Sequence, residues 1–125
     1  MHHKKAPVNL NLLSIRLPVT AFVSILHRVT GLLLFVSLPF VLLLFESILT
    51  DTATTQHSGF LLSQWYMRWL FLIALWSLAH HLFAGIRFLL LDIDIGVMRS
   101  TARQTAWVIL VLDVLFMLLL GVWVI

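Results

Sequence analysis

Residues 29–45 read VTGLLLFVSLPFVLLLF, seventeen consecutive residues between Arg28 and Glu46 that contain no charged side chain. A helix needs about 20 apolar residues, each rising about 1.5 Å, to cross the roughly 30 Å hydrocarbon core of a bilayer. The apolar character already begins near Ala21. This stretch therefore predicts one membrane-spanning helix.

Two further stretches have the same character. Residues 69–86 (WLFLIALWSLAHHLFAGI) contain no Asp, Glu, Lys or Arg, and residues 105–125 (TAWVILVLDVLFMLLLGVWVI) contain only Asp113. Isolated strands are excluded because a bilayer leaves the edges of an open sheet without hydrogen-bond partners. The sequence therefore predicts an all-α integral membrane protein. We place its three transmembrane helices at about 21–47, 64–89 and 104–125.

The composition excludes several classes of protein. The 125 residues are 62% hydrophobic and 10% charged, with a mean hydropathy of +1.08, whereas soluble domains average roughly 45–50% apolar and about 25% charged residues. A soluble enzyme domain and a disordered tail are thus excluded. The net charge of +3 is scattered, with no basic run longer than Lys4–Lys5, so no nucleic acid partner is expected. Without cysteine the chain has no disulfide and no thiolate ligand for iron–sulfur clusters.

The distribution of Lys and Arg predicts the orientation, because basic residues gather on the cytoplasmic side. The N-terminal side and the connection after the second helix share one side of the membrane, and only Arg68 lies on the other. Residues 1–13 resemble neither a signal peptide nor a transit peptide. We therefore expect a bacterial inner membrane protein whose N-terminal segment 1–20 is cytoplasmic and whose three-helix domain spans 21–125. The basic residues of the cytoplasmic side are Lys4, Lys5, Arg16, Arg28, Arg87, Arg99 and Arg103.

Polar residues at the start of the first helix share one face. They occupy positions i, i+3, i+4 and i+7 of that face: Ser24, His27, Arg28 and Gly31. This face combines a hydroxyl, an imidazole and a guanidinium beside a glycine. Such a set is suited to binding an acceptor-rich or anionic partner. Alternatively, Arg28 extends its charge to the interface and its neighbours are ordinary interfacial residues. Both interpretations remain open on this pattern.

The second helix carries one histidine within a strip of small side chains. Around His81, small residues lie seven and four positions before it and three and four after it: Ala74, Ser77, Ala84 and Gly85. A flat macrocycle needs such a surface, with a neutral imidazole to bind its iron. The alternative is that the small residues pack helices closely and the histidine bonds to another helix.

Two other ionisable residues lie within the spans. His80 is the poorer candidate for a haem ligand because Trp76, on the same face, would crowd a macrocycle. Asp113 either takes part in proton movement, pairs with a cation, or is a protonated carboxyl bonded to a neighbouring helix. We favour the protonated carboxyl because no acid or base is evident at its depth.

Two motifs resemble a known family. Residues 14–31, SIRLPVTAFVSILHRVTG, resemble the first signature of the cytochrome b-type membrane anchor subunit of succinate dehydrogenase, in which Arg-x-Pro leads into Ser-x-x-His-Arg-x-[Thr/Ser]-Gly. Residues 81–87, HLFAGIR, followed by Asp92, match the second signature, His-x-x-x-Gly-x-Arg with a later aspartate. The resemblance covers nearly the whole chain, and both motifs occur in order on consecutive spans. One departure is Phe88, where close relatives often have a histidine, so any role of that histidine is absent or supplied elsewhere.

The resemblance implies a specific site. The chain would form half of a heterodimeric helical bundle that holds haem b, with His81 as one axial ligand and a second small hydrophobic anchor subunit supplying the other. His27 and Arg28 would lie near the haem propionates. Ser24 and Arg28 would bind ubiquinone. The other implied partners are the iron–sulfur subunit, the flavoprotein subunit and membrane lipid.

The implied function is that of a membrane anchor of succinate dehydrogenase (complex II). It would help to pass electrons from succinate oxidation, in the tricarboxylic acid cycle, to quinone in the respiratory chain. The chain would have no catalytic dehydrogenase residue and no activity alone. Two alternatives remain: a haem-free structural or assembly protein, and the anchor of a fumarate reductase.

Overall fold

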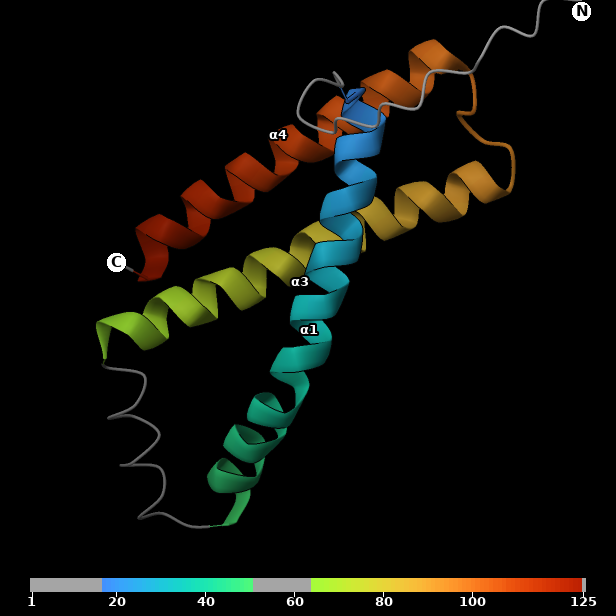
Figure 1. Cartoon of the computed structure of the whole chain (residues 1–125). Helices are drawn as coiled ribbons and strands as arrows, with labels where there is room; N and C mark the ends of the chain where they lie inside the picture. Colours follow the sequence, from blue (N-terminus) through green and yellow to red (C-terminus); the bar gives the residue numbers. More distant parts are fainter. Residues whose placement is uncertain (1–16, 51–63, 125) are drawn as a thin grey trace, which may run out of the picture.

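The computed structural model describes residues 17–50 and 64–124, which form three helices (Figure 1). All three are long and apolar enough to cross a membrane, and the described residues contain no strand. The prediction of an all-α protein with three spans is thus confirmed. The helices are α1 (Val19–Thr50), α3 (Trp65–Asp92) and α4 (Arg99–Val124).

All three helices begin before the apolar stretches that predict them, and α1 and α3 also end after them. Helix α1 begins directly after Pro18, whose carbonyl oxygen accepts hydrogen bonds from the N–H groups of Ala21 and Phe22. Helix α4 begins at Arg99, five residues before the predicted position 104. The reason is that backbone hydrogen bonding does not require apolar side chains, so a helix continues into the polar interface where the hydropathy signal has ended.

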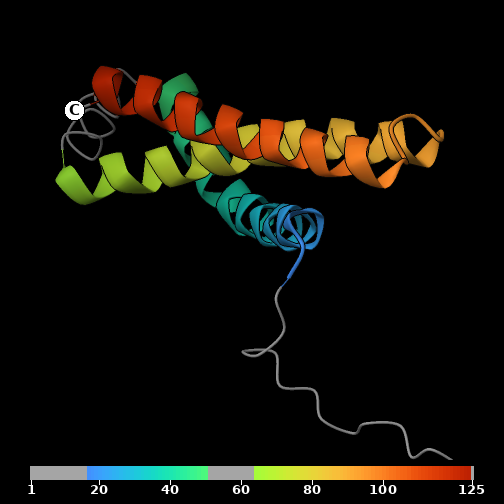
Figure 2. The same cartoon turned by 90° about the horizontal axis from the view of Figure 1, so that it is seen from above.

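A tight turn joins α3 to α4 and makes them antiparallel neighbours, which both views show (Figures 1 and 2). Asp94 adopts a left-handed backbone conformation with φ of 63°. Its N–H donates to the carbonyl of Leu91 at 3.1 Å, and the N–H of Ile95 donates to Leu90 at 2.9 Å. This pair of bonds is a Schellman cap, which satisfies the last carbonyls of α3 and reverses the chain within a few residues.

Helix α1 crosses the α3–α4 pair at a steep angle (Figure 1). The apolar core at this crossing is small and contains residues from all three helices. Small side chains there let the helix backbones approach closely, which is how membrane helices gain packing energy. The buried residues of this cluster are Val23, Ala84, Ala106 and Ile109.

The burial pattern is the reverse of that in a soluble protein. Large apolar side chains such as Phe35 and Leu119 are 74% and 73% exposed, whereas five polar side chains are buried. Lipid or partner helices must cover the exposed apolar surface, while polar groups are sheltered inside the bundle. The buried polar residues are Thr30, Ser77, His80, Arg87 and Asp113.

Arg87 links the end of α3 to the start of α4. Its Nε donates to Thr105 Oγ1 at 3.1 Å and its Nη2 to the carbonyl of Ala102 at 3.0 Å. The residue is 6% exposed. Because the guanidinium is charged and sheltered, these two bonds are stronger than neutral ones and hold the two helices together at the turn end.

Candidate functional site

His27 and His81 stack where α1 crosses α3. Their ring centroids lie 4.1 Å apart and their planes differ by 11°. His81 Nδ1 donates a hydrogen bond to the backbone carbonyl oxygen of His27, at 3.1 Å. Since a carbonyl oxygen can only accept, Nδ1 carries the proton and Nε2 of His81 keeps its lone pair. This is the tautomer that a neutral histidine needs in order to bind a metal through Nε2.

The glycines of the two motifs face the histidines of the opposite helix. A Cβ atom at Gly31 would lie 3.0 Å from His81 Cε1 and 3.3 Å from its Nδ1. A Cβ atom at Gly85 would lie 3.5 Å from His27 Nε2, which is an ordinary contact. Gly31 is therefore the residue whose missing side chain lets the His81 ring approach the backbone of α1.

His27 offers a second polar atom at this crossing. Its Nε2 is buried and has no hydrogen-bond partner among the residues that the structure describes. Its ring packs against that of Phe88 in a T-shaped arrangement, with centroids 5.2 Å apart. A buried polar nitrogen usually has a hydrogen-bond partner, so this atom remains available to a group beyond the described residues.

The two other predicted site residues lie beside this pair without contacting it by hydrogen bonds. Arg28 is exposed and Ser24 is half-buried, and both are within one turn of His27 on α1. In the described ranges, 17–50 and 64–124, neither side chain makes a hydrogen bond or an ion pair. The structure thus brings His27 and His81 together and leaves Arg28 accessible to a partner.

The strip of small residues around His81 divides into two parts. Ser77 and Ala84 are 0% exposed, so other helices of this chain already cover them and the packing interpretation holds for both. Ala74 and Gly85 are only partly buried, as is His81. The surface available to a macrocycle is therefore narrower than the whole strip.

His80 and Asp113 form a buried pair between α3 and α4. A 2.6 Å hydrogen bond joins His80 Nδ1 to Asp113 Oδ2, and the two side chains are 0% and 7% exposed. The expectation that Asp113 has no basic partner at its depth is wrong. His80 lies seven residues before Arg87 and Asp113 eight residues after Thr105. Because Arg87 and Thr105 are hydrogen-bonded to each other, these axial distances from them, each roughly 11 Å, coincide in an antiparallel pair. That coincidence was the signal that sequence reasoning missed.

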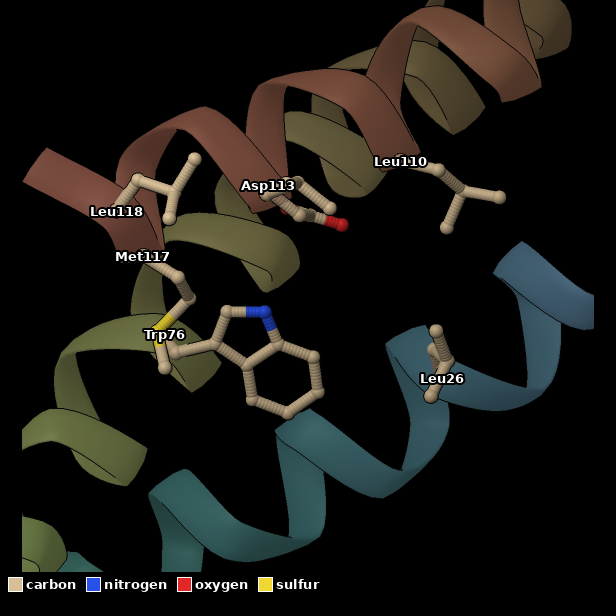
Figure 3. Close-up of a pocket in the computed structure, with 7 residues that line it drawn as sticks. Leu26, Trp76, Leu110, Asp113, Met117 and Leu118 are labelled. Carbon is tan, nitrogen blue, oxygen red and sulfur yellow. The ribbon is translucent and has the colours of Figure 1, made fainter.

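A pocket of about 370 Å³ lies beside Asp113 (Figure 3). Figure 3 shows a carboxyl oxygen of Asp113 and the indole nitrogen of Trp76 pointing into it. None of the predicted haem or quinone residues lines it, so this pocket is separate from the predicted site. Its lining residues are Leu26, Trp76, Leu110, Asp113, Val114, Met117 and Leu118.

Comparison with known proteins agrees with this architecture. The model of the family described as "Succinate dehydrogenase/Fumarate reductase transmembrane subunit" matches residues 2–120. The chain is also 31% identical over 121 residues to the "Succinate dehydrogenase cytochrome b556 subunit" of Coxiella burnetii (strain RSA 493 / Nine Mile phase I), an alignment that covers 96% of this chain and 97% of the relative. Both matches extend over all three spans. The chain therefore belongs to the family of succinate dehydrogenase/fumarate reductase transmembrane subunits.

Proposed function

We propose that this subunit anchors a succinate dehydrogenase in the membrane, holds haem b and forms part of the ubiquinone-binding site. The observation that carries the haem assignment is the hydrogen bond from His81 Nδ1 to the His27 carbonyl, at 3.1 Å. It leaves Nε2 of a partly exposed imidazole ready to bind iron. The family and the name of the Coxiella relative, a cytochrome b556 subunit, support the same assignment.

The residues present fit a haem b shared with a second anchor subunit. His81 and a histidine of the partner would hold the iron. His27 Nε2, which is buried without a partner among the described residues, and the exposed Arg28 guanidinium supply donors for the propionates. When bound, the haem supplies a one-electron redox centre.

Ser24 and Arg28 are the residues that we assign to ubiquinone. The Ser24 hydroxyl can donate a hydrogen bond to a quinone carbonyl oxygen. The Arg28 guanidinium stabilises the negative charge that develops on that oxygen during reduction, and this stabilisation is greatest in a site sheltered from water. Because Arg28 has no intramolecular partner among the described residues, its donors remain available to the substrate.

The proposed orientation places these groups on the cytoplasmic side of a bacterial inner membrane. Arg28 lies near the start of α1, and Arg87 and Arg99 lie on either side of the α3–α4 turn, whereas Arg68 lies at the opposite end of α3. This asymmetry supports a cytoplasmic N-terminus. The iron–sulfur and flavoprotein subunits would then dock at this face and deliver electrons from succinate. Lys4, Lys5 and Arg16, which contribute to the same argument, lie outside the described residues.

A second candidate is the same anchor role in a fumarate reductase, which the family description also includes. The chain would bind haem and quinone in the same way, and the direction of electron flow would depend on the quinone potential and on the other subunits.

The haem assignment is tested by a reduced-minus-oxidised absorbance spectrum of the purified complex. His81→Ala should abolish or alter the b-type spectrum because it removes one axial ligand. The matched control is Leu82→Ala, which truncates the adjacent side chain, 55% exposed, and should leave the spectrum unchanged. An unaltered bis-imidazole spectrum in His81→Ala would show that the iron ligand lies elsewhere.

A further inference from the structure

Two consecutive histidines on α3 are both chemically able to bind iron. Their side chains point in directions that differ by about 100° around the helix axis. His80 is 0% exposed and faces α4, whereas His81 is partly exposed and faces α1. We propose that Asp113 is a positioning residue that selects His81 as the haem ligand by holding His80 against α4. This inference rests on the proposed assignment of His81 as the axial ligand.

The bond between His80 and Asp113 is suited to this role. At 2.6 Å, with side chains 0% and 7% exposed, the contact is short and sheltered from water. A hydrogen bond in such surroundings is electrostatically stronger than in water, and breaking it would leave an unpaired polar group in an apolar interior. The bond therefore resists rotation of the His80 side chain away from α4.

Arg87 provides a second attachment on the same face of α3. It lies seven residues after His80, which is two helical turns, so both side chains project toward α4. Trp76, one turn before His80, packs against the imidazole with ring centroids 5.9 Å apart. With two polar attachments to α4 two turns apart, α3 has one rotational setting, and that setting turns His81 toward α1.

Loss of Asp113 would release a competing ligand. His80 Nε2 has no hydrogen-bond partner among the described residues, so Asp113 is the group that holds the ring by a hydrogen bond. Freed from it, His80 would gain by turning toward iron, because a buried polar group without a partner is costly. The pocket of about 370 Å³ beside Asp113 gives room for substitutions at that position.

The experiment uses the assembled complex purified from membranes. Low-temperature electron paramagnetic resonance of the oxidised haem reports the identity and orientation of the axial ligands. Four forms are compared: the parent, Asp113→Asn, Asp113→Leu and the double variant His80→Leu/Asp113→Leu. Asp113→Asn is the matched control because it keeps a hydrogen-bonding group of the same size.

The parent and Asp113→Asn should each show one low-spin haem species. Asp113→Leu should add a second species that accounts for more than about one tenth of the haem. This threshold is roughly the population of a conformation that is tenfold less favoured than the main one. The double variant should return to one species because His80 can no longer compete and no polar group is left unpaired. A loss of stability alone would not produce this pattern, because it would change thermal denaturation without splitting the resonance.

Two results would overturn the inference: a single parental species in Asp113→Leu, or a double variant as heterogeneous as Asp113→Leu. If Asp113→Leu does not assemble, Asp113→Ala, which introduces no larger side chain, is judged by the same two results. If the inference about Asp113 fails but the haem assignment is right, His81→Ala should still abolish or alter the b-type spectrum. A parental spectrum in His81→Ala would instead refute the haem assignment on which the inference rests.

Discussion

The Nδ1 atom of His81 lies 3.1 Å from the backbone carbonyl oxygen of His27, and the two imidazole rings stack 4.1 Å apart. The proton position on His81 is therefore controlled by the backbone of another helix. Backbone carbonyls commonly orient metal-binding histidines in this way. Substitutions at the α1–α3 crossing should therefore change the position of His81, and with it the properties of the proposed haem, even where they remove no functional group.

Gly31→Ala should displace the His81 ring. The added Cβ would lie 3.0 Å from His81 Cε1, and such overpacking typically costs about 1–3 kcal/mol. We expect a lower melting temperature of the complex and a shifted haem midpoint potential. Gly121→Ala is the control, because a Cβ there meets nothing within 4 Å and both changes raise helix propensity equally. Equal behaviour of the two variants would mean that the Gly31 contact is unimportant.

Arg28→Leu should impair quinone reduction. Removing a preorganised donor from a developing oxyanion costs on the order of 10²–10³ in rate, whereas transfer of electrons from succinate to a soluble dye bypasses the membrane site. We therefore expect a selective loss of succinate–quinone activity, which Arg28→Lys should partly restore.

Ser24→Ala should raise the KM for ubiquinone with little effect on dye reduction, because it removes one neutral hydrogen bond of about 1 kcal/mol. Ser37→Ala on the same helix is the matched control, since the Ser37 hydroxyl donates to the Leu34 carbonyl of its own helix at 2.8 Å. Quinone kinetics that are the same in Ser24→Ala and Ser37→Ala would argue against a contact between Ser24 and the substrate.

Arg87→Leu should destabilise the complex without altering quinone chemistry. It removes bonds of 3.1 and 3.0 Å to Thr105 and Ala102, and a hydrogen bond from a charged group contributes about 1.5–3 kcal/mol. Thermal denaturation of the complex measures this loss. Arg103→Leu, which removes an exposed arginine of α4, should have a much smaller effect. If both variants melt at the same temperature, the Arg87 link is not stabilising.

Expressed without its partners, the chain should bind haem poorly. In the proposed site it would supply one of the two histidine ligands and part of the pocket, and each 1.4 kcal/mol of lost binding free energy lowers affinity tenfold. Haem per chain, measured in membranes with and without the second anchor subunit, should differ by at least about tenfold. Full haem occupancy of the isolated chain would contradict a shared site.

The number of spans and the depth of His81 follow from the linear order of residues. Each of the three apolar stretches is long enough for one crossing, and hydrocarbon thickness makes that length a property of a single helix. Periodicity also places Ser24, His27 and Arg28 together on α1. None of these inferences requires knowledge of which helices touch.

The pairing between helices depends on how the spans cross. Three contacts join residues on different helices. They are the His80–Asp113 hydrogen bond, the hydrogen bond from His81 to the His27 carbonyl, and the close approach of His81 to Gly31. Ser77 and Ala84 are buried by packing for the same reason. Helical periodicity identifies the residues that share a face, whereas crossing angle, axial offset and close backbone approach determine which faces meet, and these are set by side-chain packing among all three helices.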